Sequence, residues 1–385
     1  MSSTPAPRTD RFAFIHALRG VAAMLVVWSH LSGFWLLENQ TTSAAQDLWR
    51  IYLATPLHLF QNGGHLGVVL FFLISGFIIT HTSLREDRRA FAIKRTLRIF
   101  PPLAVATLVC GLLLLVAAAT ETRLLGINGG DALHWISSLV LVDGFLPGGR
   151  ALDVTWTLVI EVVFYALTFA LLGLSRRSPL LSTAVMAVAW VLLSIAVTFV
   201  PIAVQTGNSG LAVYVGFLVL GRVIYLGYAR LINRWVALGL GVAVALAFLG
   251  LTEYFSPGFL IAPGGWAGYE PIVSYGYALA IFMALMVIAP KRTVQPFTLL
   301  GDVSYSLYLL HLPIGITALN LLNLAGVPES VAVVIAIALA IAVSWLSWRF
   351  VEVPFQKLAR TWVRRGTPIA VDSAAQIPDE KRPIT

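Results

Sequence analysis

Two ionisable residues lie within the first long apolar segment of the chain. Arg19 and His30 are eleven residues apart, so on a helix they share one face, roughly 16 Å apart along its axis. An arginine can bind phosphate or carboxylate, and a histidine can accept a proton near neutral pH. Because ionisable groups are costly inside a membrane, we interpret the pair as functional. The alternative is a snorkelling arginine and a histidine hydrogen-bonded to a neighbouring helix.

A glutamate lies in the fourth long apolar segment, in the run WTLVIE that joins Trp156 to Glu161. If this segment crosses the membrane in the direction opposite to the first, Glu161 lies at a depth similar to that of His30. A carboxylate beside a histidine fixes its tautomer and stabilises the imidazolium. We therefore predict that His30 is a catalytic base oriented by Glu161, with Trp156 as a supporting residue. The alternative is a protonated glutamate bonded to a carbonyl group.

Arg95 and Arg98 are three residues apart beside a Pro-Pro pair, and this spacing puts them near one helical face. Two guanidinium groups so placed can hold a polyanion at the membrane surface. We predict that Arg19, Arg95 and Arg98 bind an anionic substrate. The alternative is that the pair only anchors the helix at the cytoplasmic surface.

Three polar residues, Ser304, Tyr308 and His311, follow an i, i+4, i+7 spacing and line one face of the ninth apolar segment. We expect them, together with Tyr305 and Ser75, to form the wall of a cavity. A stripe of interhelical hydrogen bonds would explain any single member equally well.

The elements that position these residues are predicted to be membrane-spanning helices. The chain is 58% hydrophobic and only 11% charged, whereas a soluble domain has about 25% charged residues. Apolar runs recur that are long enough, at about 20 residues, to cross a bilayer as helices. We place ten spans at roughly 12–37, 65–81, 101–119, 154–174, 180–200, 211–229, 235–252, 272–290, 302–322 and 328–351. The predicted fold is an all-α, polytopic integral membrane protein.

The positive charge indicates an orientation rather than a nucleic-acid partner. The net charge is +8, but most of the 26 Lys and Arg residues fall on one side of the ten spans. Positive residues concentrate in cytoplasmic loops, so we expect both termini in the cytoplasm.

Cys110 lies inside an apolar run and is interpreted as a packing residue. Residues 133–142 are amphipathic but too short to span, which suggests a re-entrant or interfacial helix.

Six motifs in order along residues 19–354 resemble those of the membrane-bound acyltransferase family 3, the O-acyltransferases that modify cell-surface glycans and other extracytoplasmic acceptors. The motifs are the arginine and histidine of the first span, followed by FFLISGF, RTLRIFP, WTLVIEVVFY, SYSLYLLHLP and FVEVP. The resemblance covers nearly the whole chain except its C-terminal tail.

The resemblance implies transfer of an acyl group, with acetyl expected, from cytoplasmic acyl-CoA to a hydroxyl of a surface or exported glycan. It implies His30 as the catalytic base and Arg19, Arg95 and Arg98 as donor-binding residues. The expected partners are acyl-CoA, a glycan or lipid-linked saccharide acceptor and membrane lipids, without nucleic acid. No bound cofactor or metal is expected, and the expected location is the bacterial cytoplasmic (inner) membrane.

Three parts of the chain are expected. Residues 1–11 form a cytoplasmic N-terminus, 12–355 a transmembrane acyltransferase domain, and 356–385 a basic, disordered cytoplasmic tail.

The main alternative function is a secondary transporter or flippase for an anionic lipid or saccharide, in which buried Arg, His and Glu would bind substrate and protons. Transporters often contain inverted repeats with helices broken at matching places, and the sequence shows no matching pair of breaks.

Overall fold

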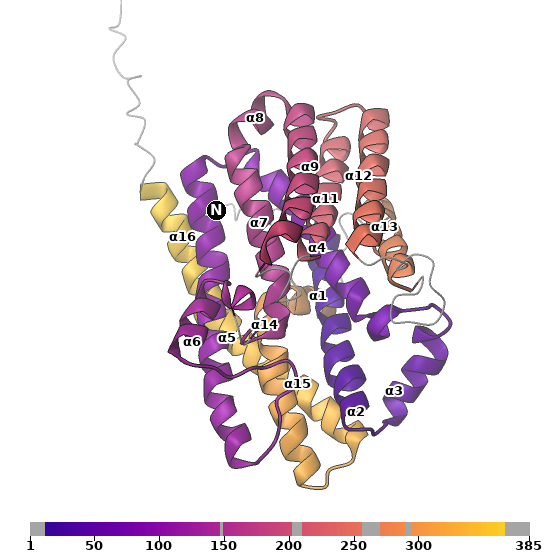
Figure 1. Cartoon of the computed structure of the whole chain (residues 1–385), viewed down its shortest axis with the longest axis vertical. Helices are drawn as coiled ribbons and strands as arrows, with labels where there is room; N and C mark the ends of the chain where they lie inside the picture. The colour runs from indigo at the N-terminus through magenta and orange to yellow at the C-terminus, as the bar shows by residue number, and fades with distance from the viewer. Residues whose placement is uncertain (1–11, 147–148, 202–209, 256–269, 289–294, 366–385) are drawn as a thin grey trace, which may run out of the picture.

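The computed structural model of the chain describes residues 12–146, 149–201, 210–255, 270–288 and 295–365 (Figure 1). Within them, ten helical stretches are long and apolar enough to cross a membrane. This confirms the predicted all-α, polytopic fold. The helices are α1 (Ala13–Trp28), α2 (Trp35–Glu38), α3 (Ala44–Trp49), α4 (Gly64–Ser83), α5 (Arg88–Ala119), α6 (Ala132–Leu139), α7 (Trp156–Ala170), α8 (Leu172–Arg177), α9 (Pro179–Ala196), α11 (Val215–Tyr228), α12 (Arg234–Phe255), α13 (Glu270–Ile288), α14 (Gln295–Leu324), α15 (Glu329–Ser347) and α16 (Val353–Arg365).

The bundle has two ends of different character. Helices α1, α5 and α14 begin and α4 finishes at one end, where Phe12 packs against His81 with ring centroids 5.1 Å apart. We call this the basic end, because Arg85, Arg88 and Arg89 lie in and beside the turn between α4 and α5. At the opposite end, here called the far end, α2 and the turn between α14 and α15 lie together at the bottom of Figure 1.

The first span changes its helical form where it carries the histidine. Helix α1 continues into a π-helical segment at Ser29–Phe34, and α2 follows it directly. The backbone N–H of Trp35 donates to the carbonyl of His30, which is the i→i+5 bond of a π-turn. Such turns inside α-helices occur frequently at functional sites. The sequence did not predict this feature.

The turn before α4 packs against the π-helical segment. The hydroxyl of Ser29 donates to the carbonyl of Gln61 over 2.7 Å, and the side chain of Gln46 bridges Asn62 and Ser32 over 3.0 and 2.9 Å. Gln61 and Asn62 have φ values of 52° and 53°, a left-handed conformation that is uncommon outside glycine. Backbone held in this conformation is often found at functional sites, because its surroundings must compensate for the strain.

Helices α1 and α14 approach closely at two glycines near the basic end. A Cβ atom on Gly301 would lie 2.1 Å from the carbonyl oxygen of His16, and one on Gly20 would lie 2.2 Å from that of Phe297. The small residues let the two backbones touch, as is common between membrane helices. This crossing fixes the register of the two helices that carry most of the candidate site.

The crossing gives a first testable prediction. We expect Gly301→Ala to lower the free energy of unfolding by about 1–3 kcal/mol, because the added methyl group forces the backbones apart. Gly239→Ala in α12 is the matched control, since its Cβ would meet nothing within 4 Å. Thermal unfolding in detergent would measure both variants. Equal melting temperatures for Gly301→Ala and wild type would contradict the close approach.

The C-terminal segment differs from the expectation. Residues 356–365 belong to α16 and are not disordered, whereas residues 366–385 lie outside the described part of the chain. The helix forms because apolar residues recur at helical spacing among its cations, and Ala359 is buried. The amphipathic residues 133–142 overlap α6, which turns Leu133 and Ile136 outward and buries Ser137. An outward apolar face is compatible with the expected interfacial location.

Candidate active site

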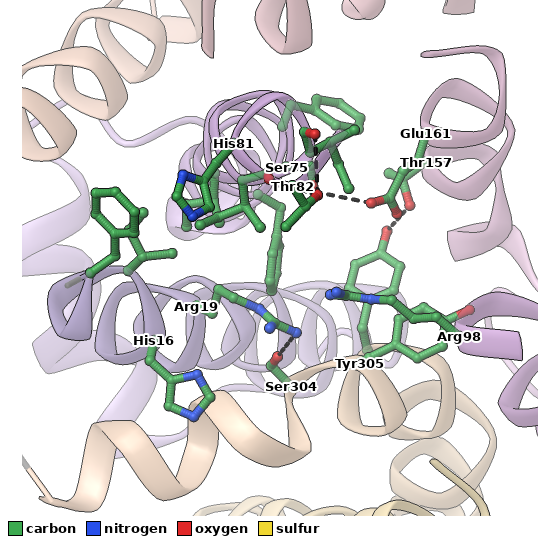
Figure 2. Close-up of a pocket in the computed structure, with 18 of the residues that line it drawn as sticks. His16, Arg19, Ser75, His81, Thr82, Arg98, Thr157, Glu161, Ser304 and Tyr305 are labelled. Atoms are coloured by element: carbon green, nitrogen blue, oxygen red, sulfur yellow. Dashed lines mark hydrogen bonds between the residues drawn. The ribbon is translucent and has the colours of Figure 1, made fainter. Parts of the chain in front are cut away.

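A cavity of about 450 Å³ lies among α1, α4, α5, α7 and α14 near the basic end (Figure 2). Its polar lining consists of His16, Arg19, Ser75, His81, Thr82, Arg85, Arg98, Thr157, Glu161, Ser304, Tyr305 and Tyr308. Apolar side chains from α1, α4 and α7 complete its wall. We call this cavity the arginine pocket.

Two arginines direct their guanidinium groups into the same space in Figure 2. Arg19 donates to the hydroxyl of Ser304 over 2.8 Å, whereas Arg98 makes no hydrogen bond or ion pair with any residue that the structure describes. The two like charges interact with each other across the pocket. An anion between them would relieve this repulsion and accept charge-assisted hydrogen bonds from both.

Glu161 lies in the wall of the same pocket. Its carboxylate accepts hydrogen bonds from Ser75 over 3.0 Å and from the hydroxyl of Tyr165 over 2.6 Å. Its negative charge interacts favourably with Arg19 and Arg98. The carboxylate therefore partly balances the two cations and orders one side of the pocket.

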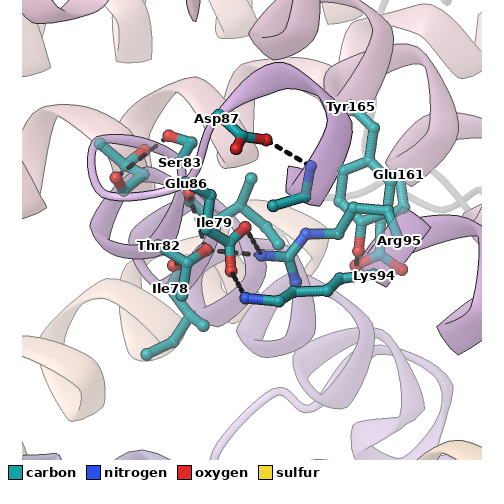
Figure 3. Close-up of polar contacts among 12 residues, drawn as sticks. Ile78, Ile79, Thr82, Ser83, Glu86, Asp87, Lys94, Arg95, Glu161 and Tyr165 are labelled. Atoms are coloured by element: carbon teal, nitrogen blue, oxygen red, sulfur yellow. Dashed lines mark hydrogen bonds and ion pairs between the residues drawn. The ribbon is translucent and has the colours of Figure 1, made fainter. Parts of the chain in front are cut away.

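Arg95 does not line the pocket but makes the polar contacts drawn in Figure 3. Its guanidinium donates to Thr82 over 2.6 Å and to Glu86 over 3.3 Å, and Lys94 donates to the same glutamate over 2.9 Å. It also lies over the ring of Tyr165, 5.8 Å from the ring centroid. This arginine is buried and ties the start of α5 to the end of α4, outside the wall of the arginine pocket. The expectation that it binds the donor with Arg98 is not supported by this geometry.

A pair of histidines lies further along the same two helices. Nε2 of His311 on α14 is 3.1 Å from Nδ1 of His30, and the ring centroids are 5.0 Å apart. His311 is fully buried, and its Nδ1 lies 3.0 Å from the carbonyl oxygen of Leu307. Nδ1 of His30 also lies 3.0 Å from the carbonyl oxygen of Val26.

These contacts assign the protons of the neutral pair. A carbonyl oxygen only accepts, so Nδ1 of His311 carries its proton and Nε2 of His311 is an acceptor. Nδ1 of His30 must then be the donor to both His311 and Val26. The remaining nitrogen, Nε2 of His30, keeps its lone pair and makes no hydrogen bond with a described residue. An oriented imidazole with a free lone pair is the group that a general base requires.

The side chain hydrogen-bonded to His30 is therefore His311, and not Glu161, which was expected in this position. Topology alone predicted a similar depth for Glu161 and His30, but depth does not fix the direction in which each side chain points. On α7, Glu161 faces Ser75 and Tyr165, and no hydrogen bond between described residues joins it to His30.

Tyr308 stands between the pocket and the histidine pair. Its ring lines the pocket, and its centroid is 6.0 Å from that of His311. Its hydroxyl accepts from Thr157 over 2.9 Å and donates to the carbonyl of Val154 over 3.1 Å, which holds the ring against α7. Trp156 packs against neighbouring aromatic rings and is not part of the pocket wall.

The pocket contains one further residue that was expected, Tyr305, and several that were not predicted. Tyr305 was expected as support, and its hydroxyl donates to the carbonyl of Ile99, the residue after Arg98, over 3.0 Å. Thr157 lies within the WTLVIE run, and its position beside Glu161 was the available signal. Arg85 and His81 line the pocket near the basic end, where they were hidden among other charged and polar residues. The described residues contain no group of three or more His, Cys, Asp or Glu that could hold a metal ion.

Comparison with known proteins identifies the family of the chain. A sequence profile of an acyltransferase domain matches residues 12–349, which is most of the chain. The chain belongs to the acyltransferase 3 family. As a family member with ten candidate spans, it is a membrane acyltransferase. No solved structure matches the chain significantly.

Relatives of this acyltransferase share about a quarter of their residues with it. It is 27% identical over 330 residues to nodulation protein 10 of Rhizobium leguminosarum bv. viciae, covering 79% of this chain and 85% of the relative. It is 26% identical over 357 residues to the putative membrane-bound transacylase BcsY of Komagataeibacter xylinus, covering 88% and 81%. It is also 26% identical over 333 residues to the O-acetyltransferase OatA of Staphylococcus aureus, covering 77% of this chain but only 53% of OatA.

Proposed function

We propose that this acyltransferase moves an acyl group, with acetyl expected, from cytoplasmic acyl-CoA to a hydroxyl of a surface or exported glycan. The observation that carries the proposal is the order of groups along α1 and α14. Arg19 bonded to Ser304 comes first, and His30 bonded to His311 follows deeper in the bundle. An anion-binding pocket thus leads toward an oriented base.

The arginine pocket suits the phosphate groups of coenzyme A. Arg19 and Arg98 face each other without a carboxylate bonded to either, so both can donate to phosphate oxygens. Arg85 lies in the same wall nearer the basic end, where a further phosphate would enter. Arg95 contributes indirectly, because its bonds to Thr82 and Glu86 fix the helix that carries Arg98.

The orientation in the membrane supports a cytoplasmic donor. The basic end carries Arg85, Arg88 and Arg89 between consecutive spans, and positive residues of this kind are retained in the cytoplasm. The arginine pocket would then face the compartment that contains acyl-CoA. For a bacterial protein this orientation corresponds to the cytoplasmic membrane.

The chemistry follows from the free nitrogen of His30. Nε2 takes the proton of the acceptor hydroxyl as the oxygen attacks the carbonyl carbon of the thioester. The C–O bond forms, the C–S bond breaks, and the imidazolium returns the proton to the coenzyme A thiolate. His311 stabilises the charged ring of His30 through the same hydrogen bond that fixes its tautomer. Transfer through an acyl-histidine at the same nitrogen would use the same groups.

The names of two relatives favour an oxygen acceptor. OatA is named an O-acetyltransferase, and BcsY a putative membrane-bound transacylase. These names support transfer to a hydroxyl and acetyl as the transferred group.

The proposal is tested with the purified protein in lipid nanodiscs and radiolabelled acetyl-CoA. The acceptors are surface glycans extracted from a strain in which the gene for this protein is deleted. We expect label to appear on the glycan as an alkali-labile ester, together with stoichiometric release of coenzyme A. Movement of glycan across a liposome membrane without consumption of the thioester would show a transporter instead.

A further prediction concerns His311, which we assign as a positioning residue. His311→Leu removes the acceptor for Nδ1 of His30, and we expect kcat to fall about 10- to 100-fold, in line with loss of a hydrogen bond to a charged group. KM for acetyl-CoA should stay within about twofold, because His311 does not line the arginine pocket.

The variant His311→Gln separates positioning from packing. Its amide oxygen can take the place of Nε2 as acceptor, so it should recover much of the lost kcat. If His311→Gln were as slow as His311→Leu while both variants fold normally, the hydrogen bond to His30 would not be the cause.

A further inference from the structure

A second cavity, of about 310 Å³, lies at the far end of the bundle. Its wall includes Trp35 and Glu38 from α2, Arg123 from the segment after α5, and Asn320 and Asn323 from the end of α14. We call it the far groove. It shares no lining residue with the arginine pocket.

The far groove begins one turn beyond the proposed base. The backbone N–H of Trp35 donates to the carbonyl of His30, so the two residues are one π-turn apart, about 7 Å along the helix axis. Nε1 of Trp35 donates to Oδ1 of Asn320 over 2.9 Å. This bond is a second contact between the first span and α14, five residues beyond His30 on one side and nine residues beyond His311 on the other.

The same two helices therefore carry three cross-bonds in succession. Arg19 to Ser304 lies in the arginine pocket, the histidine pair lies between, and Trp35 to Asn320 lies in the far groove. The far groove and the arginine pocket therefore lie on opposite sides of the histidine pair along these helices.

The charged side chains that line the far groove balance one another, whereas arginines outnumber carboxylates in the arginine pocket. Nη1 of Arg123 and Oε1 of Glu38 form an ion pair over 3.5 Å, with side-chain exposures of 84% and 55%. The groove's one cation is thus matched by its one anion among the described lining residues. Asn320 also donates to the carbonyl of Arg123 over 2.9 Å, which holds the segment after α5 against α14.

This set of groups suits a neutral ligand rich in hydroxyls. Amides, a carboxylate and a guanidinium supply both donors and acceptors, which a sugar hydroxyl can satisfy at the same time. A polyanion would meet Glu38 beside the one arginine among the described lining residues, and an acyl chain would remove water from these polar groups without offering a hydrogen bond in return.

We propose that the far groove binds a neutral sugar unit of the acceptor and presents one of its hydroxyls toward His30. This assignment rests on the proposed function, since it supplies the acceptor half of the same reaction. Arg123, Asn320 and Asn323 become acceptor-binding residues, and Trp35 couples their position to the helix turn that carries His30.

The test uses isothermal titration of the full protein in nanodiscs with a panel of neutral oligosaccharides built from glucose, galactose and N-acetylglucosamine. We expect at least one to bind, and we expect Arg123→Gln and Asn323→Leu each to weaken its affinity about tenfold, as for one lost hydrogen bond. Arg50→Gln is the matched control, because Arg50 is also an exposed far-end arginine, 3.6 Å from Asp47. Its affinity for the sugar should not change.

Binding of acetyl-CoA is measured on the same samples to separate the two proposals. Absence of sugar binding throughout the panel, or sugar affinity unchanged in both groove variants, would overturn the assignment of the groove. Those results would leave the proposed function standing if label still passes from acetyl-CoA to glycan. Sugar binding that depends on Arg123 and Asn323, in a protein that never consumes acetyl-CoA, would support the groove and reject the proposed function.

Discussion

Replacing His30 with alanine should lower the rate of acyl transfer by about 10²–10⁴-fold, the usual contribution of a positioned general base. The reason is that Nε2 of His30 is the one nitrogen of the histidine pair left with a free lone pair once the bonds of His311 and Val26 are assigned. Transfer of label from acetyl-CoA to glycan measures the effect. Acetyl-CoA affinity should be retained, because His30 does not line the arginine pocket.

The control for this prediction is His58→Ala. His58 is an exposed histidine of the far end and lies outside both cavities. Its replacement should leave the rate within about twofold of wild type. Undiminished transfer by a folded His30→Ala variant would show that another group accepts the proton.

Replacing Arg98 with glutamine should raise KM for acetyl-CoA about 10- to 100-fold, which corresponds to one charge-assisted hydrogen bond of about 1.5–3 kcal/mol. Arg98 faces the pocket and makes no hydrogen bond or ion pair with a described residue, so its charge is available to the donor phosphates. Direct titration of acetyl-CoA separates this effect from chemistry. The acetylated fragment of coenzyme A that lacks the pyrophosphate should bind to the variant and to the wild type with the same affinity.

Two other arginines of the same helix serve as comparisons. Arg89→Gln removes an exposed charge at the start of α5 and should leave KM for acetyl-CoA within about twofold. Arg95→Gln should lower thermal stability, because it leaves the partly buried carboxylate of Glu86 paired with Lys94 alone. If Arg89→Gln weakened acetyl-CoA binding as much as Arg98→Gln, a diffuse basic surface rather than the pocket would bind the donor.

The spans and the main polar residues were predictable because their signals are local. The length of each apolar run predicts a spanning helix. An ionisable residue within such a run indicates a functional group, because its placement in the membrane costs free energy. The spacing of Ser304, Tyr308 and His311 placed them on one face of α14, and the structure places the first two in the pocket wall and the third against His30.

The partners of these residues were not predictable, because they depend on how helices face one another. Glu161 and His30 were assigned similar depth, yet the rotation of α7 directs Glu161 to Ser75 and Tyr165. Arg95 and Arg98 share a helical face by spacing, and only the position of Glu86 shows which of them is already bonded. The π-helical segment at His30 is hydrogen-bonded to the turn before α4, which lies about 30 residues away in the sequence and is not visible in any local pattern.

The central claim is that acyl-CoA occupies the arginine pocket with its acyl group directed toward His30. An experimental structure of the protein with a non-hydrolysable thioether analogue of acetyl-CoA tests it most directly. We predict the pyrophosphate between Arg19 and Arg98 and the acyl carbon past Tyr308, within reach of Nε2 of His30. An analogue bound outside this pocket, or bound with its acyl group turned away from His30, would contradict the claim.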